Sequence, residues 1–343
     1  MQWKNAVAES RRLLVIVDPT SDTQPAVERA VWLAERLGAS VELLICDYDP
    51  YLAGERFYDS DSLRTAREAL IDGHLRRLKE LARSLKTHGV TLSVDARWDH
   101  PLSEGIDRKV LEVKPYLVVK ATHYHPAIKR SIFSNTDWNL IQNCPAPLLL
   151  VKPRVLADKP CVMAAVDPVH AHDKSAELDH QILSWAEELC LAAGGQLHVF
   201  HAFDPAPAIA AEMTTMLTPI SAPLGKLTEE LKQRHRQALD DLLEEHSLGS
   251  LESHVHQGSP QELLNTFAKH IKADFVVMGA VSRSGLKQVF IGSTAERVLD
   301  HLPCDLLIVK LPRLRDDRGR PRVGIARSRS SLLSVLNPRR SAI

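Results

Sequence analysis

The chain has 343 residues, of which 44% are hydrophobic, and its charged side chains sum to a formal net charge of zero. This length suits two domains of about 150 residues each, and the charge balance argues against a broadly basic nucleic-acid-binding protein. No apolar run is long enough to predict a membrane span, and five separated cysteines without a Cys-x-x-Cys pair argue against a disulfide framework or a zinc site. We therefore expect a cytoplasmic protein with reduced thiols.

Short apolar runs alternate with amphipathic stretches through the first half of the chain. Apolar residues three and four positions apart indicate helices, and continuous apolar runs indicate buried strands. The pattern predicts strands at 13–17, 41–46, 91–96, 116–120 and 148–152, and helices at 25–37, 62–86, 102–113 and 137–143. Such alternation is typical of a doubly wound α/β fold, in which helices cover both faces of a parallel sheet.

The second half repeats the first. The offset between matching positions drifts slowly, from 149 residues (Asp18 to Asp167) to 158 residues (Lys152 to Lys310). A small drift in constant order indicates a duplicated domain. The repeat predicts strands at 162–166, 196–202, 251–256, 274–278 and 305–310, and helices at 176–192, 226–246, 261–271 and 294–301.

We expect four segments along the chain. They are an N-terminal lead (1–10), a first domain (11–154), a second domain (160–312) and a disordered tail (313–343). The tail carries nine arginines against two aspartates, so it is either a basic arm for nucleic acid, acidic lipid or a partner, or a solvated extension. We favour the solvated extension, and expect no nucleic-acid binding elsewhere because the rest of the chain is net acidic.

A glycine-bearing loop in the second half has the features of a phosphate-binding site. Gly279 ends a predicted strand, and Gly292-Ser293-Thr294 begins a predicted helix. The first N–H groups of a helix have no intrahelical partners, so they can donate to an anion there. The hydroxyls of Ser293 and Thr294 could add donors, and Arg283 could bind a phosphate through two N–H groups.

These residues resemble the universal stress protein family, in particular its tandem E-type branch, over the chain to about residue 311. Nucleotide-binding members carry Gly-x2-Gly-x9-Gly-(Ser/Thr), and this chain reads Gly279-x2-Ser282-x9-Gly292-Ser293. The resemblance places Asp167 near an adenine and Ala202 in the adenine pocket. Ser282 replaces the second glycine, and is either strained or a further donor. The resemblance also implies two five-stranded sheets of order 3-2-1-4-5, related by a pseudo-twofold axis.

The matching loop of the first half has lost its glycines. It reads Ala121-x2-Tyr124-x9-Ser134-Asn135. A tyrosine in this loop would crowd a phosphate, so we expect no nucleotide in the first half. Asp18 precedes a proline and is interpreted as a turn residue. His254 and His256 share one face of a strand and are interpreted as partly buried residues, not metal ligands.

The resemblance implies a bacterial stress-response protein that binds ATP or a related adenine nucleotide in its second domain, with Mg²⁺ entering only through the nucleotide. We identify no catalytic acid, base or metal ligands, and favour binding without fast turnover over an enzyme. A regulatory or scaffold protein that binds an apolar small molecule or a protein partner is the alternative. It draws on residues 205–225, which contain one charged side chain, Glu212. The sequence does not decide whether the chain forms a homodimer.

Overall fold

The computed structural model describes residues 11–53, 60–122, 134–169, 176–207, 209–210, 224–280 and 301–311. The first half contains ten elements, which are β1 (Arg12–Ile16), α1 (Pro25–Leu37), β2 (Ser40–Asp47), α2 (Pro50–Ala53), α3 (Ser60–Ser84), β3 (Leu92–Trp98), α4 (Leu102–Val113), β4 (Leu117–Ala121), α5 (Asn135–Asn143) and β5 (Leu148–Val151). The predicted strands and helices are all present, with ends shifted by a few residues. The short helix α2 was not predicted.

The second half repeats this order in its described residues. Its elements are β6 (Cys161–Ala165), α6 (Ala176–Ala193), β7 (Gln196–Phe203), α8 (Leu224–Glu245), β8 (Glu252–Gln257), α9 (Pro260–His270), β9 (Phe275–Gly279) and β10 (Asp305–Val309). These agree with the predicted elements. All but the last residue of the helix predicted at 294–301 lies outside the described residues.

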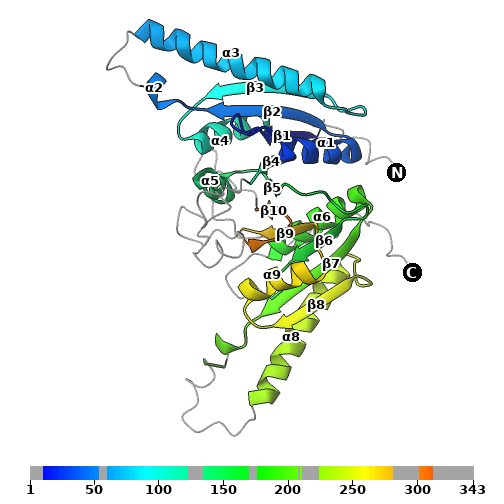
Figure 1. The fold of residues 1–343 in the computed structure, drawn as a ribbon. Helices are drawn as coiled ribbons and strands as arrows, with labels where there is room; N and C mark the ends of the chain where they lie inside the picture. Colours follow the sequence, from blue (N-terminus) through cyan, green and yellow to red (C-terminus); the bar gives the residue numbers. More distant parts are fainter. Residues whose placement is uncertain are drawn as a thin grey trace, which may run out of the picture. The chain divides into compact units, whose positions relative to one another are not determined.

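One sheet of ten strands runs through both halves (Figure 1), in the order β3-β2-β1-β4-β5-β10-β9-β6-β7-β8. Each half has the predicted order 3-2-1-4-5 with parallel neighbours, which confirms the expected fold. The two five-stranded sheets are joined because β5 and β10 pair antiparallel. Leu149 pairs with its own repeat equivalent, Leu307, so a local twofold axis passes between these residues.

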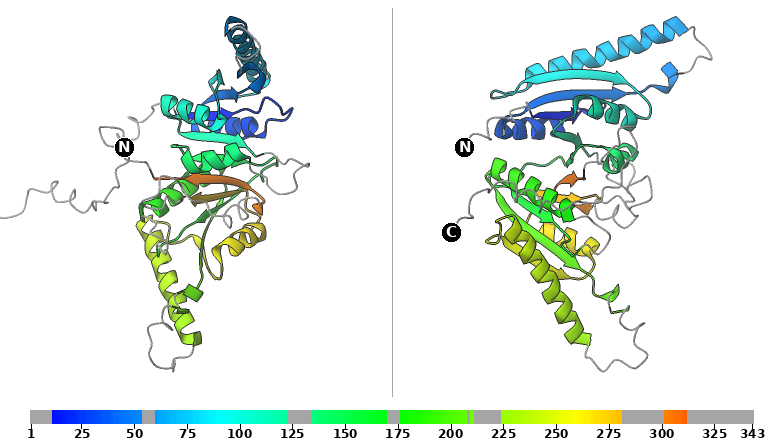
Figure 2. Two further views of the ribbon diagram at one scale, coloured as in Figure 1. Left: turned by 90° about the vertical axis from the view of Figure 1, so that its left-hand side faces the viewer. Right: turned by 180° about the vertical axis from the view of Figure 1, so that it is seen from behind.

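Helices cover both faces of this sheet (Figure 2) because alternate strand residues point to opposite faces. On β9, Phe275 and Val277 join the hydrophobic cluster that includes residues of α1, α3, α6 and α8. Val276 joins the cluster that includes residues of α4, α5 and α9. Strands buried on both faces explain the continuous apolar runs in the sequence. No helix among the described residues is both long and apolar enough to cross a bilayer.

Polar contacts also link the halves across the β5–β10 junction. Arg154, just after β5, pairs with the buried Asp274 at 2.5 Å and donates to two carbonyl oxygens of the second half. Two lysines at equivalent positions of the repeat also link the halves, each donating to carbonyl oxygens of the other half. Lys310 donates to the carbonyl oxygens of Leu140 and Cys144, and Lys152 donates to that of Leu302.

Candidate functional site

Three sequence-predicted residues meet at the carboxyl end of the second-half strands. Asp167 follows β6, Ala202 lies near the end of β7, and Gly279 is the last residue of β9. β6 lies between β7 and β9, and the strand order reverses between β6 and β9. Ligands of doubly wound sheets bind outside the carboxyl ends of the strands at such a reversal. The register brings these residues together at the expected edge.

Asp167 is held at this edge by its main chain. Its N–H donates to Oδ1 of Asp179, a fully buried residue of α6, at 3.0 Å. The preceding N–H, of Val166, donates to the carbonyl oxygen of Phe200 on β7. The Asp167 backbone is therefore fixed between a helix and a neighbouring strand, and its side chain remains partly accessible.

Two histidines that the sequence did not single out lie beside Asp167. His201 of β7 is buried. Its Nδ1 lies 3.0 Å from the carbonyl oxygen of Val166, and because a carbonyl oxygen only accepts, Nδ1 is the donor. Its Nε2 is hydrogen-bonded to Nδ1 of His235 on α8 at 2.8 Å. Burial and the nearby His201 lower the pKa of His235, while the charge of Asp167 opposes that shift. The neutral form of the His235 ring is therefore favoured. Nothing in the sequence spacing of these histidines shows that they meet, because they lie on different elements.

Position 279 favours glycine because a helix packs directly over it. A Cβ at this position would lie 2.6 Å from Cδ2 and 2.8 Å from Cγ of Leu178, and 3.1 Å from Cδ1 of Ile182. Both side chains belong to α6. On one face of the strand, the space beside Gly279 is thus filled by helix–sheet packing.

The close approach at Gly279 predicts a cost for adding a methyl group. We expect Gly279→Ala to lower the free energy of unfolding by about 1–3 kcal/mol, because overpacking forces α6 to shift. Urea unfolding of the full chain measures this. Gly225→Ala, where an added Cβ meets no atom within 4 Å, is the control and should be near neutral or slightly stabilising. Equal unfolding midpoints for Gly279→Ala and the unmodified chain would contradict the packing argument.

The remaining predicted site residues are Ser282, Arg283, Gly292, Ser293 and Thr294. All of them lie outside the described residues, as does most of the segment 205–225. The donors of the loop therefore stay predictions. The described strands place the loop's first residue, Gly279, beside Asp167.

The corresponding place in the first half is closed by the chain itself. Ser134 caps α5, and its N–H and hydroxyl both donate to Oδ2 of Asp137, at 2.7 Å and 2.9 Å. In return, the N–H of Asp137 donates to the Ser134 hydroxyl, which completes a capping box. Oδ1 of Asp137 lies 2.6 Å from Nζ of the buried Lys120 on β4. A carboxylate of the chain thus occupies the helix start at which the second-half loop would receive a phosphate.

Asp18, the first-half counterpart of Asp167, forms a local turn. Its Oδ1 accepts hydrogen bonds from the N–H and the hydroxyl of Thr20, at 2.7 Å and 2.6 Å. This agrees with the turn interpretation of the Asp-Pro sequence. The Asp18 carboxylate is therefore engaged by its own turn.

Comparison with known sequences identifies relatives over most of the chain. The family model described as the universal stress protein family matches residues 9–152 and 169–310. The chain is similar to universal stress protein E of Salmonella typhi, at 29% identity over 310 residues, covering 89% of this chain and 95% of that protein. It is also similar to universal stress protein E of Escherichia coli K12, at 28% identity over 306 residues and the same coverage.

Solved structures share the fold over a similar length. One is a putative universal stress protein from Pseudomonas aeruginosa UCBPP-PA14, with a TM-score of 0.64 and 24% identity, covering 88% of this chain and 94% of that chain. Another is a universal stress protein from Archaeoglobus fulgidus, with a TM-score of 0.60 and 16% identity, covering 88% of this chain and 99% of that chain. At these identities the likeness concerns the arrangement of the elements only.

Proposed function

Because the chain belongs to the universal stress protein family, we propose that it is a stress-response protein whose second half binds ATP or a related adenine nucleotide. The observation that carries this proposal is the position of Asp167. It follows β6 at the point where the strand order reverses, beside Gly279, from which the glycine-bearing loop continues. We propose limits of 11–154 and 160–312 for the two domains.

The proposed roles follow from the chemistry of each group. The Asp167 carboxylate accepts a hydrogen bond from an adenine amino group or a ribose hydroxyl, and Ala202 leaves room for the base. The N–H groups and hydroxyls at Gly292, Ser293 and Thr294, with Ser282 and Arg283, donate to the phosphates. Mg²⁺ would enter only with the nucleotide. No catalytic residue is assigned, so the proposed activity is binding without fast turnover.

The matched test of this proposal uses the two repeat-related aspartates. Asp167→Ala should weaken ATP binding by at least tenfold, about 1.4 kcal/mol, because the adenosine loses a hydrogen-bond acceptor. Asp18→Ala should leave the affinity unchanged, because that side chain belongs to a turn in the half without a site. Equilibrium binding of labelled ATP to the full chain measures both, and Gly292→Trp should abolish binding by filling the phosphate position. Binding that is absent, or equal in all variants, would refute the proposal.

A second candidate function draws on residues 205–225. This segment begins two residues after the end of β7, near the edge that carries Asp167, and contains one charged residue, Glu212. An apolar small molecule or a protein partner would suit it. Native mass spectrometry of freshly purified protein distinguishes the candidates: a retained nucleotide mass supports the first and a retained lipid-like mass the second.

A further inference from the structure

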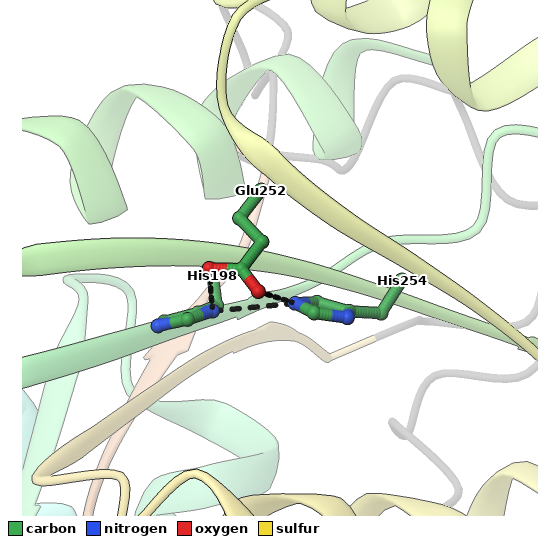
Figure 3. Close-up of side chains that lie close together, drawn as sticks. All are labelled: His198, Glu252 and His254. Atoms are coloured by element: carbon green, nitrogen blue, oxygen red, sulfur yellow. Dashed lines mark hydrogen bonds and ion pairs between the residues drawn. The ribbon is translucent and has the colours of Figure 1, made fainter.

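Two histidines and a glutamate converge on the outer strands of the second half. His198 lies on β7, and Glu252 and His254 lie on β8, the last strand of the sheet. The register pairs His198 directly with Glu252, and His254 is two residues further along the same strand. All three side chains therefore lie on one face of the sheet. Figure 3 shows the Glu252 carboxylate facing the nitrogens of both rings.

The distances within this cluster match those between ligands of one metal ion. Nδ1 of His198 lies 3.2 Å from Nε2 of His254. The carboxylate oxygens of Glu252 lie 3.6 Å from the first nitrogen and 3.8 Å from the second. Two atoms bound at about 2.0–2.1 Å to a tetrahedral zinc ion are about 3.3–3.4 Å apart. A metal ion placed between the three groups would need only small side-chain shifts.

Burial and openness also suit a metal site. The His198 and His254 side chains are 13% and 21% exposed, so both rings are largely held by their surroundings, whereas Glu252 is 68% exposed. Phe267 of α9 packs against the His254 ring at a centroid distance of 4.6 Å. With two imidazole nitrogens fixed by packing and a carboxylate at the surface, a metal ion here would keep one coordination position open to water.

A second trio of the same residue types in this half provides a contrast. His180 bonds through Nδ1 to His246 at 2.7 Å and lies 3.5 Å from Glu245 through Nε2. Its partners thus lie at opposite sides of the ring, so no single ion can touch all three residues. Within the described parts of the chain, His198, Glu252 and His254 form the one group of three such residues whose ligand atoms converge.

We propose that His198, Glu252 and His254 bind a divalent transition-metal ion, with zinc as the occupant and water as the fourth ligand. Imidazole nitrogens and a carboxylate are ordinary zinc ligands. Spacing within single segments did not predict a metal site, because these three residues lie on two different strands. The ion would clip the outermost strand β8 to β7. It would lie near the first residue of β8, whereas the proposed nucleotide lies at the carboxyl ends of the strands.

Cobalt(II) is the probe of this site. The full chain, without a polyhistidine tag and first treated with a chelator, is titrated with Co²⁺, and its visible absorption reports tetrahedral coordination by protein ligands. We expect one Co²⁺ per chain, displaced by Zn²⁺. Glu252→Gln and His254→Gln should weaken this binding by at least tenfold.

Matched controls come from the second trio. Glu245→Gln changes a glutamate that is 66% exposed, close to the exposure of Glu252, and His246→Gln changes a half-buried histidine of a histidine pair. Both should leave Co²⁺ binding unchanged. Because Glu252 is exposed, Glu252→Gln should fold normally, and zinc should raise the melting temperature of the unmodified chain but not of this variant. No saturable Co²⁺ absorption, or equal losses in test and control variants, would overturn the proposal.

Discussion

Replacing Asp305 with alanine is expected to lower the free energy of unfolding by about 3–5 kcal/mol. Asp305 begins β10 and is fully buried, and its Oδ2 lies 2.7 Å from Nε of Arg29 on α1, which is 8% exposed. Oδ1 of Asp305 accepts the N–H of Lys152, which follows β5. The substitution leaves the guanidinium without its carboxylate inside the junction of the two halves. Urea unfolding of the full chain measures the loss.

A double variant separates the penalty of an unpaired charge from the value of the pair. Burial raises the pKa of Asp305 to about 6 and lowers the pKa of Arg29, so for both groups burial outweighs the attraction between them. Such a pair adds little net stability compared with neutral side chains of similar shape. Arg29→Met combined with Asp305→Asn, which keeps an acceptor for Lys152, should therefore recover most of the loss. A change below about 0.5 kcal/mol for Asp305→Ala is what a surface position gives and would contradict this account.

The helices and strands follow from local patterns, but the junction of the sheets does not. An apolar run such as Leu148–Val151 indicates a strand that is buried on both faces. The duplicated pattern indicates that this strand is the last one in its half. Neither pattern indicates which strand pairs with the free edge of this last strand. The pairing of β5 with β10 depends on the contact between the two halves. The role of Arg29 depends on the same contact, and the sequence pattern indicates only that Arg29 is a charged residue of a helix.

The candidate site was predictable to the same degree. Gly279 was located because it ends a predicted strand, and Asp167 was placed near it by the family resemblance; parallel strands bring their carboxyl ends to one edge of the sheet. Partnerships between elements were not predictable. His198 meets His254 only through the register of β7 with β8, and His201 meets His235 only because α8 packs over β7. Sequence spacing carries no information about either contact.

Replacing Asp137 with alanine is expected to destabilise the first half by about 3–5 kcal/mol. The carboxylate is 1% exposed and is the partner of Lys120, whose side chain is 11% exposed. It also accepts the N–H and hydroxyl of Ser134 at the start of α5. Alanine leaves a buried ammonium unpaired and removes half of the capping box. Chemical unfolding measures the loss, and Asp22→Ala, at an exposed position of the same half, should change stability by less than about 0.5 kcal/mol.

The second half suggests the compensating change. Its residues at the matching positions are Met278 for Lys120 and Ala295 for Asp137. Lys120→Met together with Asp137→Ala removes both charges, so the double variant should retain only the loss of the cap, about 0.5–2 kcal/mol. A double-mutant cycle then gives the coupling between the two side chains. Strong coupling means that the first half closes its helix start with its own carboxylate, held by a buried lysine. Additive losses would mean that Asp137 acts through the cap alone, and the lysine would then need another explanation.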